Sequence, residues 1–232
     1  MNEKVQKFEI EFSEIANDLQ KFCFMTRAKE LQLEACTKLE LLKDMASRIK
    51  QEVISCSDED AANAMLSFEE TITALLSELR MWIALKDDDA DSAWNFLVSA
   101  QYAARAAMQA HSIADHLDGY VNHLYVLEQV LFPPLAFFSP ELIIEQSKCS
   151  ICGQEYGECE NILGKAYMGK ICTRIIEKVK EVGEISLVSE PANKRARVTR
   201  FTDESGVLRD IMTWQAVSGK ISDHTEIEKS GR

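Results

Sequence analysis

Four of the seven cysteines, Cys149, Cys152, Cys159 and Cys172, lie within one stretch of 24 residues. The first two form a C-x2-C step followed directly by glycine, an arrangement in which one tight turn offers two thiolates to a metal ion. Cys159 and Cys172 complete the four ligands that close a structural zinc site. The spacing therefore predicts Zn²⁺ held by four thiolates; four unrelated thiols or a redox dithiol are the alternatives.

The other three cysteines, Cys23, Cys36 and Cys56, are dispersed through a helical pattern, which favours buried small hydrophobic side chains. An odd total argues against a complete set of disulfides. The sequence also has no run of about 20 apolar residues that could cross a bilayer, and its N-terminus lacks the apolar stretch of a signal peptide. We therefore expect reduced thiols and a cytoplasmic location.

The charge of the chain is strongly negative but unevenly distributed. A formal net charge of −12 disfavours non-specific binding to nucleic acid or to acidic membranes. Between Lys165 and Arg200, however, nine Lys or Arg residues stand against four Asp or Glu residues. A strand through 194–201 would present Arg195, Arg197 and Arg200 as a partner-binding site. We expect an acidic protein partner in preference to nucleic acid, with a solvated strand face as the alternative.

The elements that position these residues begin with a long helical segment. Apolar residues recur every three or four positions from about residue 3 to residue 54, and no glycine or proline occurs before Ser55. This pattern predicts one continuous helix or two helices with a break near Phe24–Lys29. Three further helices are expected over about 57–85, 89–116 and 117–131, where short loops favour antiparallel packing in a bundle or coiled coil.

The sequence Phe132-Pro133-Pro134 must end the helical pattern, because proline lacks the amide donor and restricts the residue before it. Beyond it we expect a short strand at Leu142–Ile144, a helix over Thr173–Val182, and strands at Ile185–Val188, Ala196–Phe201 and Val207–Val217. Residues 202–206 have the composition of a hairpin loop between the last two strands. The polar tail after Ser218 is expected to be loose.

These patterns predict a mainly α fold class. An N-terminal long-helix bundle or coiled coil occupies 1–132, and a proline-rich connector occupies 133–140. A small zinc-bound α+β module follows over 141–217, with a flexible tail over 218–232.

The cysteine segment also resembles a known module. It is similar to a zinc-knuckle insert of bacterial and phage proteins, including some related to prohead proteases. The residues that carry the similarity are Cys149-Ser-Ile-Cys152-Gly, Cys159-Glu-Asn161, Cys172 and the later Ser186-Leu-Val-Ser-Glu-Pro-Ala-Asn193. In that pattern the position of Asn161 is usually histidine and that of Leu163 is often proline. The resemblance covers about residues 149–200. It implies a zinc site and a bacterial or phage origin.

The resemblance does not extend to a protease active site. Those proteases place a serine nucleophile and a histidine base upstream of this segment, where the present chain has helical sequence. A second catalytic possibility is Arg105-x5-His111, which resembles the R-x4–6-H motif of HEPN ribonucleases and would imply cleavage of RNA, in an anti-phage setting. An arginine and a histidine on a helix are, however, more commonly solvated or hydrogen-bonded side chains.

The sequence thus favours a non-enzymatic adaptor or assembly component of a bacterial or phage complex. The helices would form homo- or hetero-oligomers, the zinc module would recognise a protein partner, and no membrane would be involved. The HEPN-like ribonuclease is the alternative.

Overall fold

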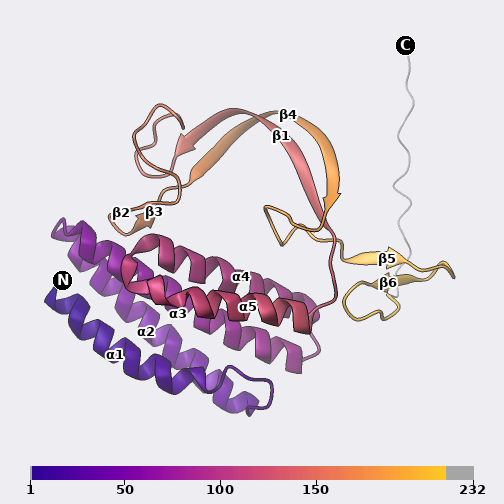
Figure 1. The fold of residues 1–232 in the computed structure, drawn as a ribbon, viewed down its shortest axis with the longest axis horizontal. Coiled ribbons are helices and arrows are strands. Elements are labelled where there is room, and N and C mark those ends of the chain that lie inside the picture. The colour runs from indigo at the N-terminus through magenta and orange to yellow at the C-terminus, as the bar shows by residue number, and fades with distance from the viewer. Residues whose placement is uncertain (1, 218–232) are drawn as a thin grey trace.

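The helical part of the chain forms a bundle in which sequential helices lie side by side (Figure 1). The computed structural model describes residues 2–217. Within them the α-helices are α1 (Glu3–Gln20), α2 (Lys29–Ser55), α3 (Glu59–Lys86), α4 (Ala90–Ala110) and α5 (Asp118–Leu131), and a 3₁₀ helix, η1, covers Ser112–Leu117. The prediction of a helical region that ends before Pro133 is confirmed.

The N-terminal helical segment is two helices, not one. A turn at residues 21–28 separates α1 from α2, and Gln32 holds it closed by donating from Nε2 to the backbone oxygens of Phe22 and Phe24, at 2.8 and 3.0 Å. The apolar seams of both helices face the interior of the same chain, where Phe8, Leu19 and Leu39 are buried. The bundle packing is therefore present, whereas a coiled coil is not confirmed.

Helix α3 is the central helix of the bundle. Its buried residues lie on all sides, because α2 and α4 pack on opposite sides of it and α1 packs on another side. Asp58 is the N-cap of α3: its side chain accepts a hydrogen bond from the amide of Ala61 at 3.1 Å. Asp89 caps α4 in the same way by accepting from the amide of Ser92 at 2.9 Å.

The helix expected over 89–116 ends earlier than predicted. His111 has extended backbone angles, and its Nδ1 accepts a hydrogen bond from the amide of Ile113 at 3.1 Å. This side-chain cap begins the 3₁₀ helix η1, so the chain turns before it enters α5. The resulting corner directs α5 back along α4.

Two long antiparallel strands, β1 (Phe137–Cys149) and β4 (Arg174–Val188), form a two-stranded ribbon. The helix predicted over Thr173–Val182 is wrong, because residues 174–182 lie in β4. Ile176 pairs with Ser147, Val179 with Ile144 and Val182 with Leu142. The spacing of these apolar residues fits a helix, but β-branched side chains also suit a strand, and a long partner strand decides the outcome. The strand predicted at Leu142–Ile144 is the centre of β1.

Two smaller hairpins complete the described chain: β2 (Ala166–Tyr167) with β3 (Lys170–Ile171), and β5 (Arg200–Thr202) with β6 (Leu208–Asp210). The hairpin loop predicted between 202 and 206 is confirmed. The strands predicted at Ala196–Phe201 and Val207–Val217 are much shorter than expected, because 196–198 bonds to the base of the ribbon instead of to a neighbouring strand of its own. The predicted tail over 218–232 lies outside the described residues.

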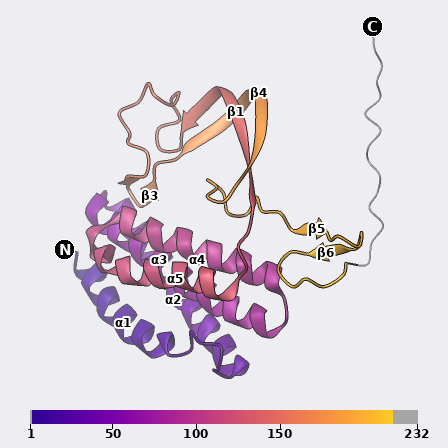
Figure 2. The same cartoon turned by 45° about the vertical axis from the view of Figure 1, so that its right-hand side comes forward.

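The ribbon arches over the bundle and contacts it at both ends (Figures 1 and 2). At its base Phe137 is buried against Trp94 of α4 and joins the bundle core. At its far end Ala166 of β2 packs with Leu66 and Ala110 of the bundle. Strand β1 begins inside the predicted 133–140 connector, so the proline segment leads directly into the ribbon. None of the helices within 2–217 is long and apolar enough to span a bilayer.

Candidate metal centre

The far end of the ribbon brings the clustered cysteines together. The Sγ atoms of Cys149, Cys152 and Cys159 all lie within 4.8 Å of one another. Four thiolates at a Zn–S distance of about 2.3 Å would be separated by about 3.8 Å in a tetrahedron. The observed separations therefore fit three ligands of one metal ion.

Cys172 lies outside that group of three but against one of its members. Its Sγ is 3.6 Å from the Sγ of Cys149, which is the separation expected for two thiolates on one ion. Both Cys149 and Cys172 are buried, whereas Cys152 is exposed. The fourth predicted ligand is thus placed beside the cluster on its inner side.

Local backbone structure presents the first two thiols. Cys149 is the last residue of β1, and the following turn closes when the amide of Gly153 donates to the oxygen of Cys149 at 3.0 Å. Gly153 has a φ of 72°, which a residue with a Cβ rarely adopts. This turn aims the amide of Ile151 at the Cys149 sulfur, 3.4 Å away. The glycine after the C-x2-C step is therefore required by the geometry of the turn.

The thiols of the cluster differ in acidity. Hydrogen bonds from the backbone amides of Cys152 and Ile151 lower the pKa of Cys149 to about 6, against the opposing effect of burial. Burial, followed by the contact with Cys149, raises the pKa of Cys172 to about 11. The backbone amide of Asn161 lowers the pKa of Cys159, but burial and the neighbouring thiols outweigh it and the net pKa is raised. Cys149 is thus the thiol that is readily available as a thiolate.

Asn161, at the position where the similar modules usually have histidine, donates from Nδ2 to the sulfur of Cys149 at 3.5 Å. An amide in this position hydrogen-bonds to a ligand and is not itself a ligand. This contact supports the interpretation that the four cysteines are the donor set.

Asn63 of the bundle ties the hairpin of β2 and β3, next to the cysteine cluster, to α3. Asn63 of α3 accepts a hydrogen bond from the amide of Gly169 at 2.8 Å through Oδ1. It also donates from Nδ2 to the oxygen of Ala166 at 3.4 Å. Gly169 lies in the tight turn between β2 and β3, three residues before Cys172. An exposed polar residue at the start of a long helix is common, so the sequence carried no signal for this role.

Comparison of the chain with models of protein families, with curated proteins and with solved structures gives no match. The resemblance of residues 149–200 to the phage-type zinc knuckle accordingly stays a prediction. What the structure adds is the cysteine cluster: Cys149, Cys152 and Cys159 lie close enough to bind a metal ion.

The predicted row of arginines does not form. Arg197 is buried and pairs with Asp91 at the start of α4. Arg195 donates to the hydroxyl of Ser99 at 2.9 Å and lies over the ring of Tyr102, while Arg200 is the exposed first residue of β5. The strand expected through 194–201 forms only from Arg200 onward, because the acidic and aromatic surface of α4 binds Arg195 and Arg197. The basic residues serve mainly intramolecular contacts.

The two residues of the ribonuclease alternative face different neighbours. Arg105 lies over the ring of Tyr125 on α5, with its guanidinium carbon 5.1 Å from the ring centroid. His111 follows the end of α4, and its Nε2 is 3.2 Å from Asp60 of α3. Arg105 therefore contacts α5, whereas His111 contacts α3.

Proposed function

We propose that this chain is a non-enzymatic, zinc-binding assembly component that associates with a second copy of itself through the ribbon. Four thiolates hold Zn²⁺ at the far end of the ribbon, and the ion keeps that end attached to α3 and α4. The resemblance of residues 149–200 to phage and bacterial modules suggests a bacterial or phage complex in the cytoplasm, where thiols stay reduced.

The observation that carries the proposal is one continuous apolar face on the ribbon. Alternate residues of β1 lie on the same side of a strand, and residues directly opposite in β4 share that side. Two register shifts, between Pro140 and Leu142 and between Ile143 and Ile144, each place one extra residue of β4 opposite β1. The face consists of four cross-strand pairs, Phe138–Leu187, Pro140–Ile185, Leu142–Val182 and Ile144–Val179. Most of these side chains are 39–63% exposed. We call these eight residues the ribbon face.

A ribbon of two strands cannot bury such a face by itself. Isolated two-stranded sheets are marginally stable in water and need a further layer. Full burial of one aliphatic side chain contributes about 1.5–3 kcal/mol. The other side of β1 carries Ser139, Glu141 and Ile143, so the apolar character is confined mainly to one side. Contiguous apolar patches of this kind mark protein interaction surfaces.

The charges of the ribbon favour a second copy of the chain as the partner that covers the ribbon face. Lys178 pairs with Glu145 and Lys148 pairs with Glu177, each at 2.8 Å, so these four groups are already compensated within the ribbon. A partner selected by charge would have little to bind on the ribbon face. A second copy offers the same apolar, uncharged face, and packing the two faces around a two-fold axis buries both at once.

Sedimentation of the purified zinc-bound protein tests this proposal. We expect reversible dimerisation in the micromolar range. The double variant Leu142→Ser, Val182→Ser should weaken it by at least about tenfold, which corresponds to about 1.4 kcal/mol. Because each copy carries a net charge of −12, salt should strengthen the association by screening repulsion.

Ile143→Ser is the matched control. Ile143 is 47% exposed and adjacent to Leu142, but it lies on the opposite side of β1. It should leave the dimer unchanged. A protein that stays monomeric at about 100 μM, or an equal effect of Ile143→Ser and the double variant, would contradict self-association through the ribbon face.

A further inference from the structure

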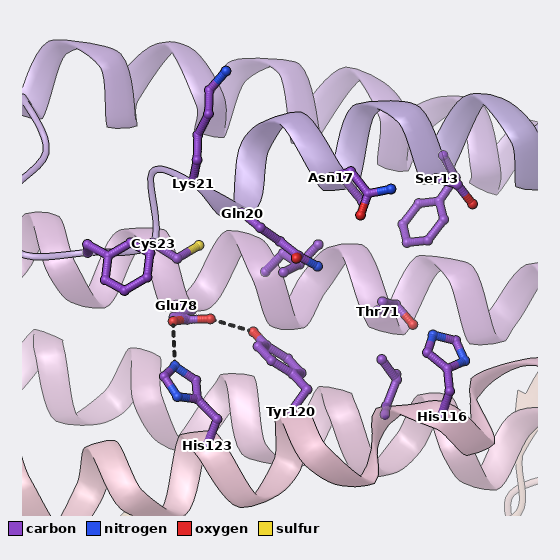
Figure 3. A pocket seen from close by; sticks show the side chains of 15 residues that line it. Ser13, Asn17, Gln20, Lys21, Cys23, Thr71, Glu78, His116, Tyr120 and His123 are labelled. Carbon is purple, nitrogen blue, oxygen red and sulfur yellow. Dashed lines mark hydrogen bonds and ion pairs between the residues drawn. The ribbon is translucent and has the colours of Figure 1, made fainter.

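A cavity of about 670 Å³ lies between α1 and α5, with α3 as its floor (Figure 3). The two outer helices flank α3 without closing over this part of it. Aromatic and aliphatic side chains supply much of the wall, including Phe12, Phe24 and Leu75. Polar groups of Asn17, Gln20 and Thr71 line the remainder. A concave site of this size and mixture is typical of sites for small organic ligands.

Glu78 of α3 is the buried charge of this cavity. Its side chain is 2% exposed. One carboxylate oxygen accepts a hydrogen bond from the hydroxyl of Tyr120 at 2.8 Å, and the other faces Nε2 of His123 at 3.4 Å. The second separation is longer than a good hydrogen bond, and His123 is charged only when protonated. The carboxylate is therefore weakly compensated for a group that is almost completely removed from water.

The other ionisable groups that line the cavity do not compensate Glu78. Lys21 pairs with Asp18 on the outside of α1. Burial, with Glu78 nearby, raises the pKa of Cys23 and the pKa of Tyr120 well above their ordinary values, so both groups are neutral. His116 is exposed and lines the wall of the cavity. Among the lining residues, His123 is the group that can supply a positive charge directly to the carboxylate.

We infer that the cavity between α1 and α5 binds a small organic amine, whose ammonium group pairs with Glu78 while its apolar body lies against Phe12, Leu75 and Phe24. A buried carboxylate gains more from a cation than an exposed one, because water screens the interaction less. A divalent metal ion is a poorer occupant, since it requires several oxygen ligands and the lining residues offer a single buried carboxylate. This inference is independent of the proposed dimer.

Protonation of His123 should compete with the amine. The hydrogen bond to Glu78, against partial desolvation, raises the pKa of His123. At low pH the imidazolium satisfies the carboxylate, and the amine must displace that proton to bind. Affinity for an amine should therefore rise between pH 6 and pH 8, while the amine itself remains protonated. The same rise should be absent in His123→Gln, which keeps a polar side chain but cannot be charged.

Calorimetric titration of the full chain with three probes of matched skeleton tests the site: 2-phenylethylamine, 2-phenylethanol and 3-phenylpropanoate. For the unmodified protein at pH 8 we expect the amine to bind about tenfold to a hundredfold more tightly than the alcohol, the range of one charge-assisted hydrogen bond. The carboxylate probe should not bind. Because this comparison uses the native sequence, it does not depend on whether a variant folds.

Two substitutions on α3 separate recognition from a purely structural role of Glu78. Glu78→Gln should abolish the preference for the amine over the alcohol. Glu70→Gln makes the same change of charge on the same helix, at a residue that does not line the cavity, and should leave the preference intact. Equal binding of amine and alcohol to the native protein, or no binding of either, would show that Glu78 only fastens α5 through Tyr120 and would overturn the inference.

Discussion

Replacing Cys152 by serine is expected to reduce bound zinc from about one ion per chain to almost none, while the helices keep their far-ultraviolet signal. Cys152 is the exposed member of the three close thiols, so the substitution removes a ligand and buries no new group. Loss of a ligand should lower zinc affinity by more than the 10- to 100-fold typical of changing a residue that only hydrogen-bonds to a ligand. Elemental analysis of protein prepared without chelators measures the ratio.

The same variant should loosen the far end of the ribbon. Without the ion, the turn around Gly153 and the hairpin of β2 and β3 depend on a few hydrogen bonds, including those from and to Asn63. Amide exchange in residues 149–172 should accelerate, while exchange in the core of α3 stays slow. Cys56→Ser is the control, because Cys56 is an exposed cysteine at the end of α2. Zinc-free native protein would refute the metal assignment.

The second large effect is expected from Trp94→Ala, at the base of the ribbon. Trp94 is almost fully buried, and its ring lies 5.3 Å from the Phe132 ring and 5.9 Å from the Phe137 ring, between centroids. Its Nε1 donates to the oxygen of Lys194 at 2.9 Å. Truncating a buried tryptophan to alanine costs about 3–5 kcal/mol. Denaturant unfolding should show a loss of that size in the free energy of unfolding.

Trp94→Phe separates the two contributions of this side chain. It retains much of the aromatic packing but removes the donor, so the oxygen of Lys194 loses its partner at a cost of about 1 kcal/mol. If the base of the ribbon and the bundle form one cooperative unit, the strands and helices of Trp94→Ala should unfold in coincident transitions. A loss below about 1 kcal/mol in Trp94→Ala would show that the base of the ribbon packs elsewhere.

The local features of this protein could be predicted from the sequence because their causes lie within a few residues. The C-x2-C-G turn depends on a glycine that tolerates positive φ, and the helix starts depend on Asp58 and Asp89 placed three residues before the amides they accept from. Pro133 and Pro134 end the helical region because they cannot donate a helix hydrogen bond. These effects require no knowledge of distant segments.

Tertiary contacts decided the remaining features. Residues 173–182 have apolar spacing that fits a helix, and only pairing with β1 makes them a strand. Arg197 looked like an exposed basic residue until the fold placed Asp91, 106 residues earlier, beside it. Glu78 is one of several acidic residues on α3, and its cavity exists because α1 and α5 leave a gap over this helix. Burial and partner choice depend on which segments meet, and that information is spread over the whole chain.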